Sequence, residues 1–176
     1  MVMLANPLII GIGSLPGSDI DEAISYSLLH DIPFLPQLIA LDGHMDEQLK
    51  NKKYSCLKTF KKRVPTSKTI KIQVSGPCSC DVELEIIKEN IDYLCHQLKG
   101  YKVIIFIDEP ILKYSSSLSS LVVYCKERFF KVGLHSCNKD LDAKLINGLG
   151  IDIISYDYFI NRELHTKIDK NISLAL

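Results

Sequence analysis

The chain alternates short, almost uninterrupted apolar runs with longer segments in which apolar residues recur every three or four positions. Most of the short runs end at a glycine or a polar residue, and their continuous apolar character predicts strands buried on both faces. They cover residues 8–12, 69–74, 103–107, 130–134 and 151–154, with a shorter segment at 34–40 and a final one at 172–176. We therefore expect about seven strands.

The longer periodic segments predict helices between these strands. They cover residues 19–30, 82–98, 117–128 and 141–149. In the clearest of them, Leu84, Ile91 and Leu98 fall on one face, and Gly100 follows as a stop signal. Asp19, or Ser18 before it, is the expected N-cap of the first helix.

A repeated strand–helix order with continuously apolar strands indicates a parallel sheet covered by helices. Such a sheet is either open and doubly wound or closed into a barrel. Polar residues gather where predicted strands end, at Ser14, Asp108, His135 and Asp157, which is typical of a barrel. We expect a single α/β domain over residues 1–176 with a parallel, TIM-barrel-like fold. Because such barrels usually need about 250 residues, we expect a truncated or incomplete one.

Charge and cysteine content narrow the classes of function. The 21 basic and 21 acidic side chains cancel, so no overall charge favours nucleic acid or a membrane surface. The first 18 residues carry no side-chain charge, but prolines and glycines interrupt them and no basic region precedes them. This composition disfavours a signal peptide and a membrane span. We expect a cytoplasmic protein whose six cysteines are reduced thiols.

Residues 50–71 hold nine basic side chains and no acidic one. The plainest interpretation is a solvated loop and helix face. The functional alternative is a patch that attracts a polyacidic small molecule. Nucleic acid is disfavoured, because few aromatic residues lie among the lysines.

His135 and Cys137 close a predicted strand two positions apart. Side chains alternate along a strand, so both are expected to project from the same face. Imidazole and thiolate are ligands that zinc prefers, but a metal site needs at least one more ligand. The structural alternative is a hydrogen-bonded core histidine beside a small buried thiol.

Six short strings occur in a fixed order along the chain. They are GIGSLP (11–16), IPFLPQL (32–38), GP (76–77), IDEP (107–110), GLHSC (133–137) and DIISYD (152–157). This order resembles the superfamily of cobalamin-independent methionine synthase and uroporphyrinogen decarboxylase. The resemblance covers most of the chain in scattered blocks and implies an eight-stranded barrel.

By this resemblance, Ser14 and Asp108 bind an amino acid substrate, and His135 and Cys137 bind a catalytic zinc ion. Asp157 stands where the methionine synthases carry a glutamate ligand. It is therefore an expected metal ligand, or else a residue that orients His135 without touching the metal.

The family's last cysteine ligand has no counterpart in the chain, and Cys78 or Cys80 is a candidate replacement. Structural roles remain open as well. Ser14 is also compatible with a simple turn, and Asp108 with a helix cap or a lysine partner. Glu109 is expected to point away from Asp108 and to act structurally or as a salt-bridge partner.

The implied function is zinc-dependent transfer of a methyl group from a folate-type donor to a thiol such as homocysteine. Zinc lowers a thiol pKa from about 8.5, so that the attacking thiolate exists at neutral pH. The alternative is a non-catalytic barrel remnant that binds a ligand or a partner. A uroporphyrinogen decarboxylase-like enzyme is a weaker alternative, because that chemistry has no use for the His135–Cys137 pair. An open sheet edge would also favour homo-oligomers.

Overall fold

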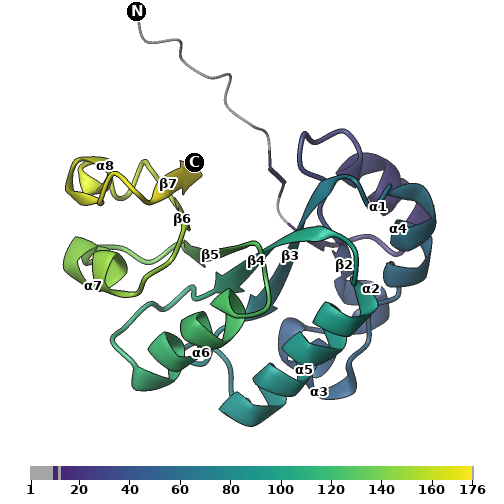
Figure 1. Cartoon of the computed structure of the whole chain (residues 1–176), viewed down its shortest axis with the longest axis horizontal. Coiled ribbons are helices and arrows are strands. Elements are labelled where there is room, and N and C mark those ends of the chain that lie inside the picture. Colours follow the sequence, from purple (N-terminus) through teal and green to yellow (C-terminus); the bar gives the residue numbers. More distant parts are fainter. Residues whose placement is uncertain (1–9, 12, 176) are drawn as a thin grey trace, which may run out of the picture.

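A parallel sheet of five strands forms the centre of the protein, in a computed structural model that describes residues 10–11 and 13–175 (Figure 1). Its strands are hydrogen-bonded in chain order: β3 (Thr69–Ser75), β4 (Lys102–Asp108), β5 (Lys131–Ser136), β6 (Ile153–Tyr156) and β7 (Ser173–Ala175). A second, two-stranded parallel sheet pairs β1 (Ser14–Leu15) with β2 (Gln37–Leu38). The predicted parallel α/β class is confirmed.

Helices occupy the connections between the strands. They are α1 (Ile20–Ser27), α2 (Ile39–Asp42), α3 (Met45–Asn51), α4 (Leu57–Arg63), α5 (Leu84–Gln97), α6 (Ser116–Lys126), α7 (Ala143–Gly148) and α8 (Leu164–Lys167). Asp19 caps α1, as predicted, because its carboxylate accepts a hydrogen bond from the Glu22 amide at 2.9 Å. Within the described part of the chain, no helix is long and apolar enough to cross a membrane.

Several predicted strands differ from the observed ones at their ends: β5 and β6 both end two residues later than predicted, and of the segment 34–40 only Gln37–Leu38 is a strand. Strand β6 ends at Tyr156, two residues after the predicted limit, because pairing with β5 continues through Ser155, a polar residue outside any apolar run. Of the strand predicted at 8–12, residues 8, 9 and 12 lie outside the described residues. Ile10 forms a parallel bridge to Ile32.

Backbone contacts link the small sheet to the large one. Lys71 on β3 donates its amide to the Pro33 carbonyl at 2.8 Å and accepts from the Leu35 amide at 2.9 Å. A parallel bridge pairs Lys71 with Phe34 between them. The segment that leads into β2 therefore runs beside β3, so that parallel segments follow one another in chain order from Ile10 to β7.

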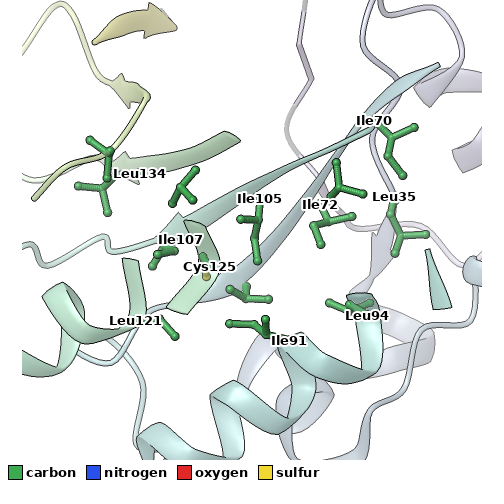
Figure 2. Packing of buried hydrophobic residues seen from close by; sticks show 14 of the residues in the cluster. Leu35, Ile70, Ile72, Ile91, Leu94, Ile105, Ile107, Leu121, Cys125 and Leu134 are labelled. Atoms are coloured by element: carbon green, nitrogen blue, oxygen red, sulfur yellow. The ribbon is translucent and has the colours of Figure 1, made fainter. Parts of the chain in front are cut away.

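The hydrophobic core lies between the large sheet and helices α5 and α6, which cover the same face of it (Figure 2). Ile72 and Ile105 point toward Ile91 of α5, while Ile107 lies beside Leu121 of α6. All five side chains are at most 2 % exposed, and full burial of such a side chain stabilises by about 1.5–3 kcal/mol.

The opposite face of the sheet carries a second, smaller cluster. Ile32, Ile104, Phe106 and Ile153 form it, and Ile10 and Ala175 pack against it. The two residues that pack against the cluster lie near opposite ends of the described chain. Polar residues share this face, because Lys71 and Gln73 alternate with Ile70 and Ile72 along β3. We call it the polar face.

A substitution at Gly133 on β5 can test the packing of the polar face. A Cβ atom at this position would lie 2.7 Å from the Phe106 ring, whereas one at Gly148, the last residue of α7, would meet nothing within 4 Å. We expect Gly133→Ala to lower the free energy of unfolding by roughly 1–3 kcal/mol, measured by urea denaturation. Gly148→Ala is the matched control, with an expected change between zero and a gain of about 1 kcal/mol. Equal effects of the two substitutions would contradict the packing.

Candidate functional site

A row of polar side chains crosses the carboxyl ends of four neighbouring strands. The parallel register pairs Ser75 with Asp108, Asp108 with His135, and His135 with Ser155. Because paired residues of adjacent parallel strands project from the same side, the four side chains share one face. Asp108 lies two positions after Phe106, so this row continues the polar face.

His135 sits between two polar neighbours within this row. Its Nδ1 atom lies 3.1 Å from the Ser155 hydroxyl oxygen, and its Nε2 atom lies 3.7 Å from the Cys137 sulfur. Burial, reinforced by the positive charge of Lys71, holds the pKa of His135 below its usual range. The imidazole is therefore neutral at pH 7, which is the form that binds a metal or accepts a proton.

The predicted zinc pair has a spacing that suits zinc. Typical Zn–N and Zn–S bonds set two tetrahedral ligand atoms about 3.6 Å apart, close to the observed separation of His135 and Cys137. Across residues 10–11 and 13–175, however, no group of three or more His, Cys, Asp or Glu side chains is arranged to hold a metal ion. Among the described residues, His135 and Cys137 are therefore two candidate ligands without a third.

Asp157, the predicted third ligand, has a structural task in its own loop. Its Oδ1 atom accepts hydrogen bonds from the amides of Phe159 at 2.9 Å and Ile160 at 3.3 Å. These bonds shape the turn that follows β6. A role for Asp157 at a metal stays a prediction.

The two cysteines considered as replacement ligands lie in the loop after β3. Cys78 donates its thiol to the Lys113 carbonyl at 3.6 Å. Burial raises the pKa of both thiols, that of Cys80 to about 11, and the charge of Glu109 adds to the increase. Both thiols are therefore protonated at neutral pH in the absence of a metal.

Asp108 carries the strongest electrostatic perturbation of the row. Burial raises the pKa of its carboxyl group to about 7; Lys71 opposes that increase and Glu109 adds to it. No hydrogen bond holds this carboxylate within the described part of the chain. Asp108 is thus divided between charged and neutral forms near neutral pH.

Glu109 points away from Asp108 and performs a structural role, as the sequence led us to expect. It is fully buried and accepts hydrogen bonds from the Cys78 amide at 2.9 Å and from the Ser79 hydroxyl at 2.6 Å. A Cβ atom at Gly76 would lie only 2.2 Å from its Oε1 atom. The loop after β3 is therefore built around this carboxylate.

Ser14 joins the site through Gln73. The Gln73 side-chain amide donates to the Ser14 hydroxyl at 2.8 Å and to the Gln37 side-chain oxygen at 2.9 Å. The Gln73 side-chain oxygen accepts from the Gly13 amide at 3.1 Å. Ser14 directs its own proton at the Met45 sulfur, a weak acceptor 3.9 Å away.

Sequence reasoning missed Gln37, Lys71, Gln73 and Ser155. A signal for two of them was present, because Lys71 and Gln73 alternate with isoleucines in an otherwise apolar strand. Of the nine basic residues in the 50–71 segment, Lys71 alone is buried, and the others are exposed or partly exposed. The segment therefore combines a solvated surface with one interior lysine.

A pocket away from Asp108 and His135 lies beside α7. It has a volume of about 450 Å³ and is enclosed by the loop before α6, residues after Cys137, and α7, with Leu112, Asn138 and Leu149 among its walls. Its lining contains none of the row residues, so the chemistry at the strand ends does not depend on it.

Comparison of the chain with models of protein families, with curated proteins and with solved structures finds no match. The resemblance to the methionine synthase superfamily therefore stays a prediction.

The raised pKa of Asp108 has a consequence for stability. An unfolded aspartate has a pKa of about 3.9, so the folded chain binds the Asp108 proton more tightly and loses stability as pH rises from about 4 to about 7. Asp108→Asn removes this loss. We measure the free energy of unfolding of both proteins by urea denaturation at pH 4 and at pH 8. The difference between Asp108→Asn and the wild type should be roughly 1–3 kcal/mol more in favour of the variant at pH 8 than at pH 4. Asp81→Asn, at an exposed position, serves as control; an equal pH dependence in both variants would refute the expectation.

Proposed function

We propose that this chain is a small-molecule-binding protein of the methionine synthase type, whose site binds an amino acid thiol such as homocysteine and supports its methylation by a folate-type donor. The row formed by Asp108, His135 and Ser155, with Cys137 beside His135, is the observation that carries the proposal. It combines a carboxylate whose pKa is raised by burial with a pair of candidate ligands for a thiophilic metal at the ends of parallel strands, where ligands of α/β proteins usually bind.

Asp108 is the residue proposed to hold the substrate's ammonium group. Its carboxylate lacks a hydrogen-bond partner in the described part of the chain and is partly ionised near pH 7. A bound cation favours the charged form, so substrate binding would lower the pKa of Asp108 and release its proton.

Ser14 is the residue proposed to donate to the substrate's carboxylate. Gln73 fixes the hydroxyl oxygen, while the hydroxyl proton faces only the Met45 sulfur. A carboxylate oxygen is a much stronger acceptor than a thioether, so a ligand at this position would displace the weaker contact.

His135 and Cys137 are the residues proposed to hold zinc, with the substrate thiol and further ligands completing the coordination. When bound, zinc would lower the pKa of the substrate thiol. The chain's own contribution is to present a neutral imidazole, oriented by Ser155, next to the Cys137 thiol. The exposed lysines of the 50–71 segment are a proposed contact for a polyacidic folate.

A barrel-like arrangement is part of the proposal. Parallel segments follow one another in chain order, and Ile10 and Ala175, near opposite ends of the chain, pack against the same cluster on the polar face. Both features support a curled sheet of barrel type. Strand β7 pairs with β6 on one side only among the described strands, and we propose self-association at that edge. Six unpaired cysteines support a reducing, cytoplasmic setting.

A second candidate is a binding module without turnover. The absence of a third metal ligand among the described residues favours it, because catalytic zinc sites usually have three protein ligands. This candidate shares the amino acid site at Asp108 and Ser14 and lacks the metal chemistry.

Titration calorimetry separates the two candidates. We expect the wild type to bind homocysteine, and zinc to increase that affinity at least tenfold, because the metal and the thiol bind each other. His135→Ala should abolish the effect of zinc and keep basal homocysteine binding. His165→Ala, at an exposed histidine on α8, is the matched control and should retain the effect.

Each other outcome has a defined meaning. Binding of homocysteine without any effect of zinc would favour the module without turnover. No binding of homocysteine with or without zinc would refute the proposed function.

A further inference from the structure

Lys71 is a buried basic residue that has no role in the proposed function. Its side chain is only 8 % exposed and lies on the polar face, on the strand next to Asp108. The ammonium donates to the Gly11 carbonyl at 2.9 Å and lies 4.7 Å above the centre of the Phe106 ring. Both contacts suit a cation, yet neither supplies a negative charge.

Lys71 lacks an acidic partner at contact distance. Across the described residues, no carboxylate forms an ion pair with it. Asp108 is close enough for each charge to affect the pKa of the other group, although no ion pair joins them. Burial of a charged group without a partner is costly, so this buried lysine calls for an anion that the described residues do not provide.

We propose that Lys71 is the anion subsite of the candidate site and binds the carboxylate of an α-amino acid whose ammonium group binds Asp108. This assignment rests on the proposed function and adds a charged partner for the substrate carboxylate to the Ser14 hydroxyl. The two opposite charges on neighbouring strands, each without a charged contact, match the two ends of such a ligand. The ammonium's remaining N–H groups would donate to the ligand, while Gly11 continues to fix the side chain.

Three thiols that differ only in their charged groups test this proposal. They are homocysteine, 3-aminopropanethiol, which lacks the carboxylate, and 4-mercaptobutanoate, which lacks the amine. We expect Lys71→Met to weaken binding of homocysteine and 4-mercaptobutanoate at least tenfold in calorimetry. Binding of 3-aminopropanethiol should change less than threefold.

Two further variants guard against a merely structural effect. Lys71→Arg keeps the charge and should retain the preference for thiols that carry a carboxylate; it also keeps the test valid if Lys71→Met does not fold. Lys68→Met, at an exposed lysine just before β3, should leave all three affinities unchanged.

Loss of affinity for all three thiols alike in folded Lys71→Met, or no loss for homocysteine, would overturn the anion subsite alone. Loss of the preference for a carboxylate in Lys71→Arg would do the same. Butanoate separates this failure from that of the proposed function. Binding of butanoate by the wild type, but not by Lys71→Met, supports the subsite even if no thiol binds. Wild-type protein that binds neither butanoate nor any of the thiols overturns both proposals.

Discussion

The parallel register of strands β3 to β6 is the constraint on which the candidate site depends. It brings Ser75, Asp108, His135 and Ser155 to one level, although they are far apart in the chain. A shift of one residue in any strand would turn its polar group into the apolar layer beneath α5 and α6. The packing of Ile72, Ile105 and Leu134 against those helices opposes such a shift. The packing that stabilises the core therefore also fixes the geometry of the site.

The two faces of the sheet differ in what they bury. The face under α5 and α6 is filled by aliphatic side chains, as Figure 2 shows. The polar face buries Lys71 and Gln73 beside a small apolar cluster. Gln73 satisfies its hydrogen bonds through Ser14, Gln37 and Gly13, and thereby ties the first strands to β3. Among the described residues, Lys71 contacts only the Gly11 carbonyl and the Phe106 ring through its ammonium, and we propose that a ligand completes the partners of Lys71 and Asp108.

Electrostatics within the site follow from burial combined with a few neighbouring charges. Burial favours the neutral forms of His135, Asp108 and Lys71 alike. Lys71 and Asp108 partly restore each other's charge, while Lys71 further disfavours protonation of His135. A small ligand with opposite charges at its two ends would therefore change the protonation of the whole group, which is how a buried polar site responds to its substrate.

The sequence by itself determined the parallel α/β class, the five strands of the large sheet and the helices α1, α5, α6 and α7, because local apolar periodicity reflects burial directly. It also indicated that Asp108, His135 and Cys137 stand at strand ends. Only the tertiary structure decided that Lys71, alone among the nine basic residues of segment 50–71, is buried. It also decided that the Gln73 side chain donates a hydrogen bond to Ser14. It likewise decided that Asp157 bonds its own turn. These outcomes depend on which strands are neighbours and in what register, and such long-range pairing leaves no periodic trace in the chain.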